Sequence, residues 1–174
     1  MLKNLIIFFF SFFLYFNSAM SNDLKIVYVD IDKIINQSNA GKQVTKQLEI
    51  LNNNNIKKFK QKEKGLADEE KKIIKQQNIL SKEELEKKVL ILQKKVKNFK
   101  SEINTSRKAL EKKRLMATSE ILKALNKIFT EYSSKNSIAL IIQKKNIVIG
   151  KSELDITDLI LTLVNEKIKN VKLK

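Results

Sequence analysis

Residues 81–103, with the sequence SKEELEKKVLILQKKVKNFKSEI, decide the fold of this chain. Their apolar residues recur alternately four and three positions apart, which is the period of a coiled-coil seam. The stretch opens on Ser81 and Glu84, spaced as a capping box that satisfies free N–H groups at a helix start. We therefore expect a long helix that begins near residue 81. Its seam should consist of Leu85, Val89, Leu92, Val96, Phe99 and Ile103.

The helix that pairs with this seam is expected upstream. From residue 41 to about residue 77 the chain is rich in Lys, Gln and Glu, and Phe59, Leu66 and Ile73 lie seven residues apart, so they should face the seam. Four asparagines at 52–55 are poor helix formers and mark an expected weak point. Residues 78–81 leave room only for a short turn. The two helices should therefore form an antiparallel hairpin, with arms roughly 60–80 Å long at 1.5 Å per residue.

A hairpin of this kind offers only narrow apolar stripes, so its base needs an anchor, which the two ends of the chain can supply. Residues 25–31 (KIVYVDI) have the composition of a strand. Residues 138–143 (IALIIQ) and 147–150 are short apolar runs separated by Lys144, Lys145 and Asn146, a pattern that predicts a β-hairpin. We expect all three strands to join in one small sheet. A final amphipathic helix should begin near Asp155, with Leu159, Ile160, Leu163, Val164 and Ile168 on one side.

The expected fold is therefore mainly α, with a long antiparallel helical hairpin projecting from a small β body. We divide the chain into a signal peptide (1–21), a body (22–41 and 115–174) and an arm (42–114). Three short strands bury little surface in one protomer, which favours self-association at this base. The residues expected to carry it are Ile26, Val27, Tyr28, Val29, Ile138, Leu140, Ile141, Ile142, Ile147 and Val148.

The N-terminal residues have the pattern of an export signal. Lys3 is the only charge before Asp23, and residues 5–16 are apolar apart from Ser11. This run matches the hydrophobic region of a secretory signal and is shorter than the roughly 20 residues that span a bilayer. Ala19 and Ser21 provide a small-x-small cleavage pattern, so we expect cleavage after Ser21. The alternative is an uncleaved membrane anchor.

The composition argues against an enzyme. The chain has no cysteine and no histidine, which excludes thiol chemistry and removes the commonest general base and metal ligand. Asp30 and Asp32 would share one face of a strand, but no third ligand is evident, and Asp32 is better interpreted as a helix N-cap. We predict no catalytic residue, no metal site and no cofactor.

The charge of the chain is concentrated on the expected arm. The formal net charge is +16, and residues 42–114 hold 22 basic and 10 acidic residues, a net charge of +12. Charge of one sign on a projecting element favours attraction of acidic partners over a purely solubilising role. The expected client-binding lysines are Lys57, Lys58, Lys60, Lys62, Lys64, Lys71, Lys72, Lys75, Lys82, Lys87, Lys88, Lys94, Lys95 and Lys97. Apolar residues outside the seam, expected to make weak client contacts, are Ile56, Ile74, Ile79 and Ile91.

Three segments give the chain a resemblance to the Skp (OmpH-like) family of periplasmic chaperones. They are KIVYVD at 25–30, NQSNAGK at 36–42 and LDITD at 154–158, and they follow the expected export signal in order. The resemblance spans the whole mature chain. It implies a periplasmic homotrimer whose three hairpin arms enclose a cavity and hold unfolded outer-membrane proteins without ATP. Family members are also said to bind lipopolysaccharide, and an anionic membrane surface is another partner compatible with the charge.

Two other functional classes share features with this sequence. An exported structural stalk or membrane-anchored scaffold would share the long charged helices, but it would have a longer apolar anchor and no reason for strands at both ends. A nucleic-acid-binding protein would share the positive charge. Against it stand the export signal and the presence of only two arginines, Arg107 and Arg114, because arginine is favoured for phosphate and base contacts.

Overall fold

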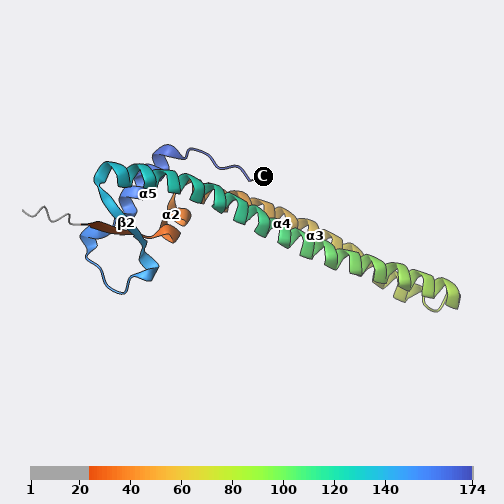
Figure 1. Cartoon of the computed structure of the whole chain (residues 1–174). Helices are drawn as coiled ribbons and strands as arrows, with labels where there is room; N and C mark the ends of the chain where they lie inside the picture. The colour runs from red at the N-terminus through yellow and green to blue at the C-terminus, as the bar shows by residue number, and fades with distance from the viewer. Residues whose placement is uncertain (1–23, 174) are drawn as a thin grey trace, which may run out of the picture.

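The protein was studied as a computed structural model, which describes residues 24–173. The expected signal peptide and its cleavage position lie outside the described residues. Figure 1 shows a small body from which a long helical hairpin projects to one side. The elements in chain order are β1 (Lys25–Val29), α2 (Ile31–Gln37), α3 (Asn39–Gln76), α4 (Lys82–Asn136), β2 (Ile138–Gln143), the 3₁₀ turns η1 (Lys144–Asn146) and η2 (Ser152–Leu154), and α5 (Thr157–Lys167).

The predicted hairpin is confirmed. Helices α3 and α4 contain 38 and 55 residues and lie side by side along the arm (Figure 1). The capping box forms as expected: Ser81 Oγ accepts a hydrogen bond from the Glu84 N–H, and the Glu84 carboxylate accepts one from the Ser81 N–H at 3.1 Å. These bonds fix the point where α4 starts, because they satisfy N–H groups that have no partner inside the helix.

Helix α3 passes through asparagines 52–55 without interruption, so the expected weak point is not a break. Asn55 Nδ2 donates a 2.7 Å hydrogen bond to Ser106 Oγ of α4. A poor helix former is tolerated here because its side chain has a partner across the hairpin. The sequence predicts a helical start near Lys33 or Gly41, and both positions lie close to a start, because α2 and α3 are separate helices divided at Ser38. The buried Ser38 hydroxyl accepts the Gly41 N–H and caps α3.

The sheet of the body has two strands, so the predicted β-hairpin is wrong. Strand β1 pairs in parallel with β2, and residues 147–150 form no strand. The other side of β1 is taken by the segment that leads into α5, where the Ile156 N–H donates to the Tyr28 carbonyl at 3.0 Å. The chain between β2 and this contact leaves the sheet through η1. Val148 and Ile149 are consequently exposed.

One hydrophobic core joins the two ends of the chain in the body. Val29 of β1, Ile34 of α2, Leu125 of α4, and Ile160 and Val164 of α5 are almost completely buried in it. Burying side chains of this size stabilises the fold by about 1.5–3 kcal/mol each.

Two details of the body correct the sequence expectations. The N-cap of α2 is Asp30, whose carboxylate accepts the Lys33 N–H at 2.8 Å, whereas Asp32 lies in the first turn. Helix α5 is amphipathic as predicted, but Leu159 is exposed and does not share the buried face of Ile160. No helix within residues 24–173 is long and apolar enough to cross a membrane.

Candidate functional site: the basic arm

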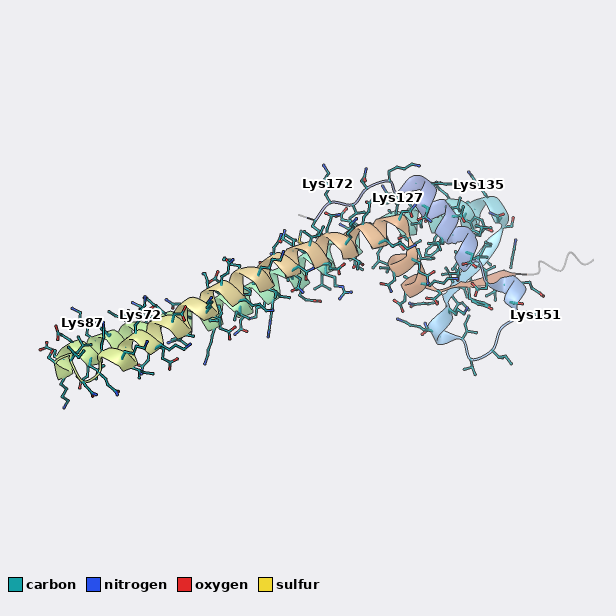
Figure 2. The ribbon with its side chains drawn as sticks, turned by 180° about the vertical axis from the view of Figure 1, so that it is seen from behind. Lys72, Lys87, Lys127, Lys135, Lys151 and Lys172 are labelled. Carbon is teal, nitrogen blue, oxygen red and sulfur yellow. The ribbon has the colours of Figure 1, made fainter. Side chains whose placement is uncertain are left out.

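The lysines expected to bind clients lie on the outside of the hairpin. All are exposed except Lys88, which is half-buried. Figure 2 shows Lys72 and Lys87 near the tip of the arm, far from Lys127, Lys135 and Lys151 of the body. Their exposure follows from the short period of the seam, because a two-helix hairpin buries one narrow stripe of each helix and leaves the rest in water.

Some of these lysines hold the two helices together. Lys58 forms an ion pair with Glu102 at 2.7 Å, Lys62 pairs with the same carboxylate, and Lys95 pairs with Glu69 at 2.6 Å. Hydrogen bonds from Lys58 and Lys62 lower the pKa of Glu102. Because these pairs are exposed to water, each contributes little to the stability of the hairpin. The two carboxylates compensate two of the three lysine charges, so these residues together add a net charge of +1 to the arm.

The remaining lysines of the expected set carry uncompensated charge. Lys88 donates a 2.8 Å hydrogen bond to Gln76, which is neutral. Within residues 24–173, ten others have a side chain with no ion pair and no hydrogen bond: Lys57, Lys60, Lys64, Lys71, Lys72, Lys75, Lys82, Lys87, Lys94 and Lys97. The sequence alone did not separate these ten from the paired lysines.

The structure places the expected seam residues between α3 and α4. Phe59 and Phe99 meet edge to face with ring centroids 6.1 Å apart. Ile73 is buried, and the other eight seam residues, Phe59, Leu66, Leu85, Val89, Leu92, Val96, Phe99 and Ile103, are half-buried. A shallow apolar groove runs along the distal arm, with Leu66 and Ile73 on one side and Leu92 and Val96 on the other. The groove exists because two helices alone cannot cover both sides of their seam.

Apolar side chains outside the seam are exposed on the same arm. Ile56, Ile74, Ile79 and Ile91 are all exposed, with Ile79 in the turn at the tip 84% exposed. Sequence reasoning missed a second group with the same property: Ile50, Leu51, Leu90, Leu115 and Met116. The signal for Ile50, Leu90, Leu115 and Met116 was available, because they fall outside the four-three spacing, whereas Leu51 continues the four-three spacing of Val44 and Leu48.

The residues expected to carry oligomerisation divide into three groups by burial. Val27, Tyr28, Val29 and Ile138 are buried within the chain itself, and Val27, Val29 and Ile138 belong to its core. Half-buried are Ile141, Ile142 and Ile147, and exposed are Ile26, Leu140 and Val148. Only the half-buried and exposed residues can offer apolar surface to a second copy.

The exposed loop after β2 is held by polar contacts around Asp155. Burial alone would raise the pKa of Asp155, but hydrogen bonds from Lys144 (2.7 Å) and Thr157 outweigh it and lower the pKa. The same bond with Asp155 raises the pKa of Lys144, whose ammonium also lies 5.8 Å from the centroid of the Tyr28 ring. These contacts orient the loop and provide no reactive group. No set of three or more His, Cys, Asp or Glu residues within 24–173 could hold a metal ion.

Comparisons with known proteins agree with this architecture. The family model described as Outer membrane protein (OmpH-like) matches residues 25–164. A crystal structure of a candidate outer membrane chaperone (OmpH-like) from Caulobacter crescentus superimposes with a TM-score of 0.80 at 17% sequence identity, covering 86% of this chain and 88% of that one. No curated protein matches the sequence significantly. The family match covers the body strands, the whole arm and most of the last helix, and on this ground the chain belongs to the OmpH-like family.

Proposed function

We propose that this protein is an ATP-independent holdase chaperone of the periplasm, which binds unfolded outer-membrane proteins between basic helical arms and prevents their aggregation. The observation that carries the proposal is the projecting arm, with ten uncompensated lysines beside exposed isoleucines. Membership of the OmpH-like family and the structural likeness to a candidate outer membrane chaperone support it.

Two kinds of contact would contribute to client binding, one to its rate and one to its persistence. The positive field of the arm speeds the encounter with an acidic unfolded chain, because steering acts over a Debye length of about 10 Å at 0.1 M salt. Dispersed apolar residues such as Ile56, Ile74 and Ile91 then hold the client weakly. Weak and adaptable contacts suit a protein that accepts many clients and must release them. Lipopolysaccharide or an anionic membrane surface would be drawn to the arm by the same field.

The holdase proposal is tested by the aggregation of a denatured β-barrel outer-membrane protein after dilution into buffer. We expect stoichiometric amounts of the purified protein to suppress light scattering, and added ATP to make no difference, since the chain has neither a phosphate-binding glycine loop nor a Walker lysine. Unchanged aggregation at stoichiometric amounts would remove the holdase function. The exported structural stalk or scaffold would then be the better interpretation.

The cavity between arms requires more than one copy, and we propose a homotrimer assembled through the body. Ile26, Leu140 and Val148 provide exposed apolar surface beside the sheet. The arms repel one another through their net positive charge, which opposes assembly along their length.

Assembly through the body predicts that a chain without its distal arm stays trimeric. The ends at 56 and 105 can be joined by a short glycine-rich loop, because Asn55 and Ser106 are hydrogen-bonded neighbours on α3 and α4. We expect the mass of this shortened protein, measured by light scattering, to be three times that of one chain. A folded monomer would instead place the assembly contacts on the arms.

A further inference from the structure

The last residues of the chain leave the body and lie along the root of the arm. After α5 ends, residues 168–173 form an extended segment, which we call the C-terminal strap. Figure 1 shows the C-terminus beside the base of the hairpin, away from the strands of the body. Ile168, expected on the apolar side of the last helix, lies just beyond its end and begins this segment.

Apolar residues of the strap complete a second hydrophobic cluster, separate from the core of the body. Val171 is buried against Ala40 and Val44 of α3 and Ala117 and Ile121 of α4. Ile168 and Leu173 pack against the same cluster, whereas Lys169, Asn170 and Lys172 are exposed. From Val171 to Leu173 alternate residues face the helices, as they would in a strand lying on a surface. The strap gives the root of the hairpin a third element that the distal arm lacks.

One glutamine side chain holds the backbone of the strap at two points. Gln47 Nε2 donates to the Val171 carbonyl at 2.9 Å, and Gln47 Oε1 accepts from the Leu173 N–H at 3.3 Å. The Gln47 carboxamide accepts from one strap residue and donates to another two positions away, as the backbone of a neighbouring strand does in a sheet. It therefore fixes the position of the strap along α3.

The strap crosses the junction between body and arm. At the body end, Asn165 of α5 accepts the Asn39 N–H at the start of α3 at 2.8 Å. At the other end, the Leu173 N–H donates to Gln47, more than two turns further along α3. Helix α4 also runs through this junction from the arm into the body, and helices of this length are rarely straight and curve gently. A strap bound across the outside of the root resists that bending.

The charges at the strap oppose its binding. Lys169 lines one surface recess together with Lys42 and Lys46 of α3, and no carboxylate is among the residues that line it. Like charges around one recess disfavour the bound strap, so its attachment depends on the packing of Ile168, Val171 and Leu173 and on the two Gln47 hydrogen bonds. A contact of a few side chains working against repulsion can open without unfolding the body.

We propose that the C-terminal strap is a conformational device that sets the direction of the arm on the body, and that its release lets the arm swing. A swing of the root would be multiplied along the length of the arm, so the strap would control how far the arm tips lie from one another. Any effect of the spacing between arm tips on client binding rests on the proposed function. The mechanical role of the strap does not.

The test measures the arm against the body in the full chain without any client. Because the protein has no cysteine, cysteines at the exposed positions Ser101 (α4, arm) and Thr162 (α5, body) can each take a spin label. Labelled chains are mixed with excess unlabelled chains, so that only distances within one chain are recorded. We expect Gln47→Ala and Val171→Asp to broaden the Ser101–Thr162 distance distribution at least two-fold. The control Lys172→Ala removes an exposed strap side chain and should leave the width unchanged.

Hydrogen exchange distinguishes a strap that sets the direction of the arm from a strap that holds the core of the body together. Release of the strap should speed exchange of amides in the first turns of α3 and leave those of β1 and β2 protected. An unchanged distance width in Gln47→Ala and Val171→Asp would overturn the proposal. Equally fast exchange throughout β1 and β2 would also overturn it, because the strap would then be holding the body together and not directing the arm. Neither the distance distribution nor the exchange rates depend on client binding, so a failed holdase assay would not affect the conclusion about the strap.

Discussion

Gly41→Ala should lower the free energy of unfolding of the body by about 3 kcal/mol, at the upper end of the usual cost of overpacking. A Cβ added at Gly41 would lie 1.6 Å from the Ile35 carbonyl oxygen and 2.8 Å from its carbon. Both atoms are backbone, so they cannot rotate away as the end of a side chain could. Relief would require α2 and α3 to separate at the buried Ser38, which caps α3 through the Gly41 N–H.

A matched control is available in the same helix. Gly65→Ala adds the same methyl group to α3, where no atom lies within 4 Å of the added carbon. Alanine is favoured over glycine inside a helix, so this variant should be more stable by about 0.5–1 kcal/mol. Urea unfolding followed by circular dichroism measures both variants. A Gly41→Ala protein as stable as the wild type would show that α2 and α3 can shift apart freely, contrary to the close contact at Ser38.

Reversing five uncompensated arm lysines should slow client capture about ten-fold at low salt. Lys57, Lys60, Lys64, Lys94 and Lys97 have no ion pair within the described part of the chain, and changing all five to Glu moves the net charge of residues 42–114 from +12 to +2. Electrostatic steering raises association rates by about 10–10³-fold, and this change removes most of the charge behind it. Dissociation should change much less, because apolar contacts hold the bound client.

The rates are measured by stopped-flow fluorescence with a labelled unfolded β-barrel protein. The difference between wild type and variant should shrink toward 0.15 M salt, where the Debye length is about 8 Å. Replacing the same five lysines by arginine keeps the charge and should keep the capture rate. If the Glu variant captures clients at the wild-type rate in low salt while remaining folded, the field of the arm does not steer the encounter.

The architecture of the arm was predictable because its signals are local. The four-three spacing of Leu85, Val89 and Leu92 and the capping box at Ser81 each depend on residues within two turns of one another. Such patterns determine a helix and one of its faces wherever the helix is placed. The same holds for α5, whose start the sequence analysis expected within two residues of its observed position.

The arrangement of the body was only partly predictable, because it depends on pairs far apart in sequence. The run at 147–150 has the composition of a strand and was expected to pair with residues 138–143, yet β2 pairs with β1, and the other edge of β1 is occupied by the contact between Tyr28 and Ile156. Composition indicates which residues favour an extended backbone, but it does not decide which segment pairs with the edge of a given strand. The exposure of Val148 and Ile149 follows from that competition.

For the candidate site, the sequence by itself determined which residue types line the arm, and the tertiary structure decided what each one is free to do. Lys58 and Lys60 have the same chemistry and lie two residues apart, yet Lys58 is paired with Glu102 and Lys60 has no partner among residues 24–173. Nor did any local pattern connect Gln47 with Val171, 124 residues away. Helical periodicity determines in which direction each side chain leaves its own helix. Ion pairs between helices and the contacts of the strap depend instead on how closely two elements lie together, which only tertiary packing sets.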